Sequence, residues 1–109
     1  KPAYLAYQTL ARELAGARYS RRLPDEETGE EQIEAYEFTL PCLDRPLWVV
    51  WTNADTRRKM DFPLSRLRVV DKFGYKRIVI DGQAEDLDGV VNGKVRIWID
   101  PSDPIYASE

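Results

Sequence analysis

Carboxylates are the residues whose spacing in this sequence could do chemistry. Asp86-Leu87-Asp88-Gly89 has the spacing of a short calcium-binding loop, but an EF-hand carries a bidentate Glu six residues after its Gly, where Val95 stands. Asp86 and Asp88 could also act as an acid–base pair. However, 19 Asp and Glu among 109 residues make close pairs common by chance. We therefore expect an Asp-rich turn, with no metal, no cofactor and no catalytic residue.

Other catalytic side chains are scarce. The sequence has no His, which removes a Cys-His or Ser-His dyad and any imidazole metal ligand. Cys42 is the single cysteine, so no internal disulfide can form. Between Pro41 and Leu43, Cys42 is expected to be a small core residue rather than a nucleophile. We expect no enzymatic activity from this chain alone.

Exposed aromatic rings are the remaining candidates, because flat rings with polar neighbours can bind sugars. Trp98 alternates out of phase with the apolar residues of segment 95–99, so it is a candidate carbohydrate contact. Packing under the N-terminal helix or against a partner domain stays open as its alternative role. Tyr75, in the mixed basic and aromatic run 72–76, is the second candidate. That single run, in a chain of net charge -3, is weak support for nucleic acid, and no nucleic-acid partner is expected.

The most apolar element available to position these residues is Leu47 to Thr52. Its six residues are apolar, aromatic or β-branched, which favours a strand. Both faces of that strand are apolar, so we expect it in the interior of a sheet. Trp48 and Trp51 fall on opposite faces, and both are expected in the core.

A helix is expected over about residues 3–17. Its apolar residues recur at helical spacing and form one stripe, made of Tyr7, Leu10, Ala11, Leu14 and Ala17. Tyr4 and Leu5 add apolar surface beside this stripe. A helix of this length is marginal alone and must dock on another surface. No segment is long and apolar enough for a membrane span, and no membrane partner is expected.

The rest of the chain reads as short strands between turns. Segment 24–32 is expected to be an acidic loop, segment 53–63 a polar connection, and Asn92-Gly93 a hairpin turn. Expected strands cover 17–23, 33–40, 47–52, 64–70, 75–81, 95–99 and 105–107. This pattern predicts a mainly β fold, an antiparallel, Greek-key-like β-sandwich with one N-terminal helix, as a single domain over residues 1–109.

The order of these segments resembles a known family. The helix contains Tyr4-Leu5-Ala6-Tyr7-Gln8-Thr9-Leu10 and leads into Leu14-Ala15-Gly16-Ala17-Arg18-Tyr19; later come Leu47-Trp48-Val49-Val50-Trp51, Val69-Val70-Asp71-Lys72-Phe73-Gly74 and a final Pro104-Ile105-Tyr106. This order is similar to the C-terminal β-sandwich that follows the TIM barrel in bacterial glycoside hydrolases and related proteins. Residues 24–32 and 83–93 have no counterpart in it.

The resemblance implies a non-catalytic accessory domain that packs on the TIM-barrel catalytic domain of the same chain and stabilises it. The catalytic carboxylates of such enzymes lie on the barrel, so none is carried over. Tyr4, Leu5 and Tyr7 would then be interdomain contacts, and the isolated domain would form a weak homodimer. Two alternatives stay open: a free-standing carbohydrate-binding module, with glycan as partner, and a protein-interaction sandwich unrelated to sugars.

The start of the sequence bears on the expected context of the domain. It opens on Lys1-Pro2 without an initiating Met, so we expect a domain excised from a longer multidomain protein. For the same reason the sequence does not distinguish a secreted protein from a cytoplasmic one.

Overall fold

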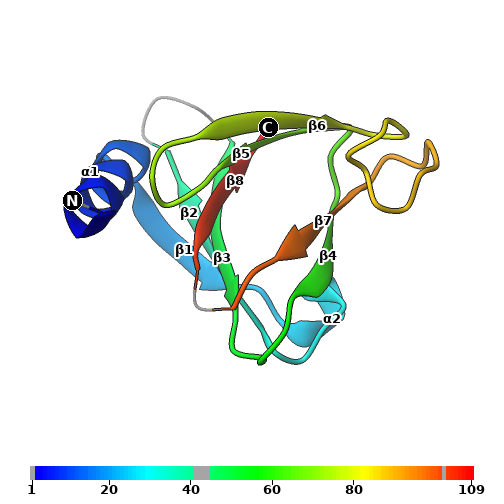
Figure 1. Ribbon diagram of the computed structural model, residues 1–109, viewed down its shortest axis with the longest axis horizontal. Helices are drawn as coiled ribbons and strands as arrows, with labels where there is room; N and C mark the ends of the chain where they lie inside the picture. Colours follow the sequence, from blue (N-terminus) through cyan, green and yellow to red (C-terminus); the bar gives the residue numbers. More distant parts are fainter. Residues whose placement is uncertain (1, 41–44, 102) are drawn as a thin grey trace.

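The computed structural model describes residues 2–40, 45–101 and 103–109, without the side chains of residues 2–7. It confirms the mainly β sandwich: six antiparallel strands form one sheet in the order β1-β2-β3-β8-β5-β6, and β4 and β7 form a second sheet that packs against it (Figure 1). The strands are β1 (Arg18–Arg22), β2 (Ile33–Thr39), β3 (Pro46–Thr52), β4 (Arg58–Phe62), β5 (Arg66–Val70), β6 (Lys76–Ile80), β7 (Val95–Ile99) and β8 (Ile105–Ser108).

The centre of the large sheet is formed by β2 and β3, which overlap the expected strands 33–40 and 47–52. The two strands are antiparallel from Ile33 opposite Thr52 to Thr39 opposite Pro46. On its other edge β3 pairs with β8, so β3 lies in the interior of the sheet as its two-faced apolarity predicts. Residues 41–44 between β2 and β3, including Cys42, lie outside the described residues, and the role expected for Cys42 stays a prediction.

The two faces of the large sheet are buried in different ways. Its inner face meets the small sheet in a core that includes Trp48, Val50, Leu67, Phe62 and Ile97. A second cluster on the outer face contains Leu47, Val49, Val70 and Tyr106, with Leu14, Phe38, Leu40 and Trp51 packed partly against it. Trp48 is therefore core, as predicted, but Trp51 is only half-buried. Side chains alternate along β3, so Trp48 and Trp51 lie on opposite faces of the large sheet. Trp51 is less buried because the other sheet covers only the inner face.

The small sheet corrects two expectations. Segment 53–63, expected as a polar connection, contains β4, whose Met60 and Phe62 are buried while Lys59 and Asp61 face outward. The charged residues of this strand lie mainly on its outer face. Because they dominate the segment, its alternation of buried and exposed residues was not recognised from the sequence. Asn92-Gly93 does not close a hairpin, because β6 pairs with β5 and β7 pairs with β4. It lies in a long loop that crosses from one sheet to the other.

Two short helices accompany the sheets. α1 (Pro2–Glu13) ends earlier than the expected limit at Ala17, because Gly16 takes φ +71° and the Ala17 N–H donates to the Leu14 carbonyl in a turn. The chain then enters β1 at Arg18. α2 (Asp25–Thr28) is a single turn within the expected acidic loop and is capped by Gly29 at φ 81°. No helix within the described ranges is long and apolar enough to cross a membrane.

Candidate functional site

Trp98 lies on the outer face of the small sheet, where it is half-buried and opposite Lys59 of β4. Two cations lie over its indole ring. The Arg57 guanidinium carbon is 4.4 Å from the ring centroid, and the Lys59 Nζ is 5.1 Å away. Both distances are typical of cation–π contacts. The expected outward position of Trp98 is confirmed, and its surroundings are electropositive.

Trp98 and Tyr75, predicted separately as carbohydrate contacts, line the same cavity. This cavity has a volume of about 260 Å³, and its wall contains Val69, Asp71, Tyr75, Lys76, Arg77, Trp98, Asp100 and Ile105. These residues come from both sheets: Val69 is in β5, Arg77 in β6, Trp98 in β7 and Ile105 in β8. The fold therefore gathers two aromatic rings and four charged side chains around one small space.

The turn between β5 and β6 explains the position of Tyr75. The Asp71 Oδ1 accepts hydrogen bonds from the backbone N–H groups of Phe73 at 2.9 Å and Tyr75 at 3.0 Å. Gly74 takes φ +92°, a backbone conformation that favours glycine. The turn holds the Tyr75 backbone, while its side chain is 75% exposed. Tyr75 thus offers an accessible ring on a fixed support.

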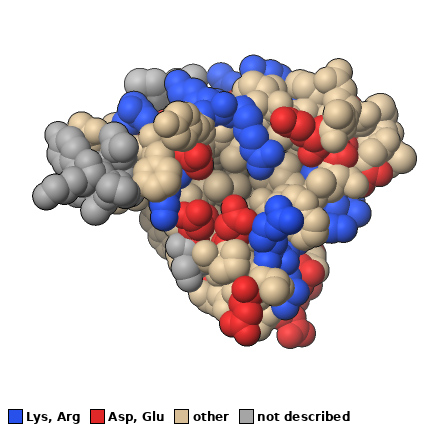
Figure 2. Space-filling model, viewed as in Figure 1, with Lys and Arg blue, Asp and Glu red and all other residues tan. Residues whose placement is uncertain are grey.

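Positive charge gathers on the same side of the molecule. Figure 2 shows Lys and Arg side chains over the region of β5 and β6 at the top of the view. These strands carry Arg66, Arg68, Lys76 and Arg77. Arg68 is paired with Glu13 of α1 at 2.8 Å. Lys76 and Arg77, which line the cavity, have no ion-pair partner among the described residues.

Helix α1 presents the second candidate surface. Thr9 is 1% exposed, and the Glu13 side chain is 7% exposed and bonded to Arg68. Leu10, in contrast, is 41% exposed, and Ala11 is exposed as well. The chain therefore covers a polar side of α1 and leaves Leu10 and Ala11 of the predicted apolar stripe open, while Leu14 and Ala17 are half-buried. The side chains of Tyr4, Leu5 and Tyr7, the predicted interdomain contacts, lie outside the described residues.

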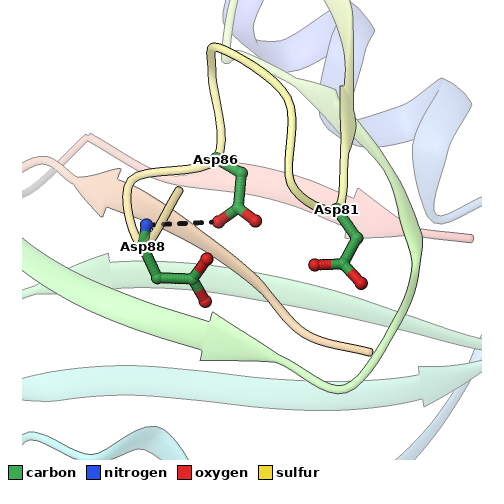
Figure 3. Close-up of side chains that lie close together, drawn as sticks. All are labelled: Asp81, Asp86 and Asp88. Carbon is green, nitrogen blue, oxygen red and sulfur yellow. Dashed lines mark hydrogen bonds between the residues drawn. The ribbon is translucent and has the colours of Figure 1, made fainter. Parts of the chain in front are cut away.

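Three aspartates of the loop after β6 lie close together. Oxygens of Asp81, Asp86 and Asp88 are within 4.8 Å of one another (Figure 3). Each carboxylate accepts backbone N–H groups of this loop or its borders: Asp86 from Gly82, Asp88 and Arg96, Asp81 from Asn92 and Gly93, and Asp88 from Val90. These bonds account for the cluster as the expected Asp-rich turn, so we assign no cation to it.

Two carboxyl groups with shifted pKa values offer no general acid. Hydrogen bonds from Arg22 and Tyr36 lower the pKa of Glu34. Burial alone would raise the pKa of Asp86, but the backbone N–H groups of Gly82 and Arg96 outweigh it and lower that pKa overall. A carboxyl group whose pKa is lowered stays ionised at neutral pH and is a poor proton donor.

A larger cavity of about 540 Å³ lies beside α2, between the two sheets. Its apolar floor includes Trp48 and Phe62, which are themselves buried, with ring centroids 5.6 Å apart. Arg21 at its wall forms a bidentate pair with Glu27, both bonds being 3.0 Å long. The two rings of its floor are buried, and Arg21 and Glu27 at its wall already satisfy each other. It is a weaker candidate than the Trp98–Tyr75 cavity.

Sequence reasoning missed an aromatic group on the outer face of the large sheet. The Tyr36 and Trp51 rings stack at 5.4 Å, and Tyr19 lies 5.7 Å from Phe38 and is 60% exposed. The signal was present, because Tyr36 and Phe38 alternate along one strand. Their proximity to Trp51 depends on the β2–β3 register, which the turn alone did not fix.

Comparisons with known proteins found no match: no family model, no curated protein and no solved structure matches this chain.

Proposed function

We propose that this chain is a non-catalytic accessory domain of a glycoside-hydrolase-like protein. It packs on a TIM-barrel catalytic domain of the same chain through α1 and stabilises that domain. The observation that carries the proposal is the orientation of α1, which turns Thr9 and Glu13 inward and leaves Leu10 and Ala11 exposed. The segment order that resembles such accessory domains gives the expected partner.

The orientation of α1 matters because a single exposed Leu is ordinary on a protein surface. What is unusual is that α1 buries Thr9 and the Glu13 side chain, while Leu10 and Ala11 of the stripe stay exposed and Leu14 is only half-buried. Amphipathic helices normally turn their apolar stripe toward the core. A second domain that covers Leu10 and Ala11 would restore this arrangement and place α1 between two packed bodies.

The test compares the isolated chain with the product of its whole gene, each carrying Leu10→Ser. In the isolated chain this exposed residue should change the free energy of unfolding by less than about 0.5 kcal/mol. In the whole protein the same change should lower stability by more than about 1 kcal/mol, because a buried Leu is lost from an interface. Calorimetry measures both values.

Gln8→Ser is the matched control, since Gln8 is exposed on the same helix and polar. It should have an equally small effect in both proteins. Analytical ultracentrifugation of the isolated chain should also show weak self-association that Leu10→Ser reduces and Gln8→Ser does not. Equal small effects of Leu10→Ser in the two proteins, or a gene product without a barrel, would overturn the proposal.

Glycan binding is the second candidate function, and one specific observation favours it. Trp98 and Tyr75 line one cavity, although 23 positions separate them in the sequence (98 − 75 = 23). Aromatic rings beside polar groups are suited to hold the C–H face of a sugar while its hydroxyl groups are hydrogen-bonded. This function is compatible with packing through α1, because it uses other residues.

A further inference from the structure

We infer that the Trp98–Tyr75 cavity binds a sugar ring that carries a carboxylate, a uronic acid unit of an acidic oligosaccharide. The inference rests on the proposed glycan binding and adds the ligand class. With about 260 Å³, the cavity is smaller than the roughly 300–1,000 Å³ of sites for drug-sized molecules. It therefore suits one ring of a chain rather than several.

Three unpaired charges in the cavity wall define what the ligand must offer. The side chains of Lys76, Arg77 and Asp100 form no hydrogen bond or ion pair within the described part of the chain. Some other charged side chains do have partners: Arg22 pairs with Glu34 at 3.0 Å, and Lys72 pairs with Asp103 at 2.9 Å. The cavity wall thus contains two cations and one carboxylate that have no partner among the described residues.

A uronic acid unit matches this set of groups. Its carboxylate can accept a charge-assisted hydrogen bond from Arg77, which lies on the same face of β6 as the buried Val79, while Lys76 on the opposite face adds positive charge at the edge of the cavity. Its hydroxyl groups can donate to Asp100, which as a carboxylate can only accept. Its apolar C–H face can lie against the Tyr75 ring. A neutral sugar would leave the two cations unused.

The cations near Trp98 favour the same ligand class. Arg57 and Lys59 lie over the indole, so part of the ring that a neutral sugar would stack on is already in contact with charged groups. Together with Lys76 and Arg77 they outnumber the two carboxylates of the wall, Asp71 and Asp100, so the surroundings of the cavity carry net positive charge. An approaching carboxylate is attracted by this field, and the attraction weakens as salt is added.

A single-stranded nucleic acid could also stack its bases on the aromatic rings here, but it fits the cavity less well. Its backbone phosphates carry negative charge without donors, and both Asp71 and Asp100 line the cavity. The Asp71 Oδ1 already accepts two backbone N–H groups, whereas the Asp100 side chain has no partner within the described part of the chain. A uronic acid carries hydroxyl donors and a negative charge on one ring, whereas in a nucleic acid the donors lie on the bases or the ribose, away from the charged phosphate.

The experiment titrates the protein with trigalacturonate and with its fully methyl-esterified form, which has the same rings without the charges. Binding is followed by ¹H–¹⁵N NMR, using the indole N–H signal of Trp98. We expect trigalacturonate to shift this signal and to bind at least about tenfold more tightly than the ester, which corresponds to about 1.4 kcal/mol. Raising the salt concentration should weaken binding of the acid only.

Variants separate the ligand class from glycan binding itself. Arg77→Ala and Lys76→Ala should each weaken trigalacturonate binding several-fold, and Tyr75→Ala should weaken both ligands. Arg66→Ala is the matched control: it removes an exposed cation of neighbouring β5 that does not line the cavity, and it should change affinity less than twofold. Since Tyr75, Lys76 and Arg77 are exposed, these variants should keep the fold.

Three results would overturn the inference in distinguishable ways. Equal binding of acid and ester, lost in Tyr75→Ala but not in Arg77→Ala, would leave glycan binding and remove the acidic class. Tighter binding of octathymidylate at the same residues would replace sugar by nucleic acid. No binding of any probe would remove glycan binding altogether, while the separate test of α1 packing would stand.

Discussion

Trp48 and Trp51 provide the sharpest test of the fold, because they are neighbours on one strand but lie in different surroundings. Trp48 is 5% exposed and tilts against Phe62, and its Nε1 donates to Glu37 at 3.0 Å. Trp51 is half-buried on the outer face and stacks on Tyr36. Replacing each by Ala therefore removes different amounts of buried surface.

The expected magnitudes follow from burial. Trp48→Ala should destabilise the domain by about 3–5 kcal/mol, as for other buried aromatic residues. Trp51→Ala removes a side chain that is only half-buried. It also removes one ring stack, and such a stack contributes about 0.5–1.5 kcal/mol beyond the effect of the buried area. We expect a total of roughly 1–2.5 kcal/mol for Trp51→Ala, less than for Trp48→Ala.

Urea unfolding followed by far-UV circular dichroism measures both changes without relying on the removed fluorophore. Trp48→Phe is a useful companion, because it keeps an aromatic ring in the core and loses the bond to Glu37. It should fall between the wild type and Trp48→Ala. If Trp51→Ala were as destabilising as Trp48→Ala, the assignment of Trp51 to the half-covered outer face would be wrong.

Two further predictions concern the loops. Asp86→Asn should cost about 1.5–3 kcal/mol at pH 7, because charge-assisted hydrogen bonds to backbone N–H groups are weakened. The pKa of Asp86 lies below its ordinary value of 3.8, so its stabilising effect is present above that value and is lost as pH falls through the lowered pKa. The difference between wild type and Asp86→Asn in acid unfolding should shrink over that range, and a constant difference would contradict it. Gly82→Ala should cost clearly more than Gly29→Ala in thermal unfolding. Both glycines have φ +81°, but a Cβ at Gly82 would clash with Val91, whereas at Gly29 it meets nothing within 4 Å; equal losses would refute the clash.

The sheet could be predicted from sequence where local pattern and burial agree. β2, β3, β5, β6, β7 and β8 overlap the expected strands, since each alternates or is apolar throughout and is bounded by turn residues, and β1 overlaps the expected strand 17–23. β4 was missed because Arg58, Lys59 and Asp61 outnumber its two buried residues. β4 is a strand because it pairs with β7, and a local sequence pattern does not show which distant segments pair.

The candidate site was predictable only in part, for a related reason. The outward position of Trp98 follows from alternation alone, and Tyr75 stands next to a recognisable turn. Their meeting in one cavity depends on how the loop after β6 crosses from one sheet to the other. The expected hairpin at Asn92-Gly93 would have joined β6 to β7 directly. The Tyr75 and Trp98 rings would then have had different positions relative to each other.

The two proposed surfaces are adjacent in space, which bears on how the domain could work. The turn between β5 and β6 lies beside α1 (Figure 1), and a Cβ at Gly74 would lie 2.7 Å from the Arg12 guanidinium. The next residue along the chain, Tyr75, lines the cavity. A catalytic domain packed on α1 would therefore stand close to a sugar held at Tyr75. Under these proposals, the accessory domain would hold one part of an acidic chain while the neighbouring domain acts on another, which raises the effective substrate concentration without any catalytic group on this chain.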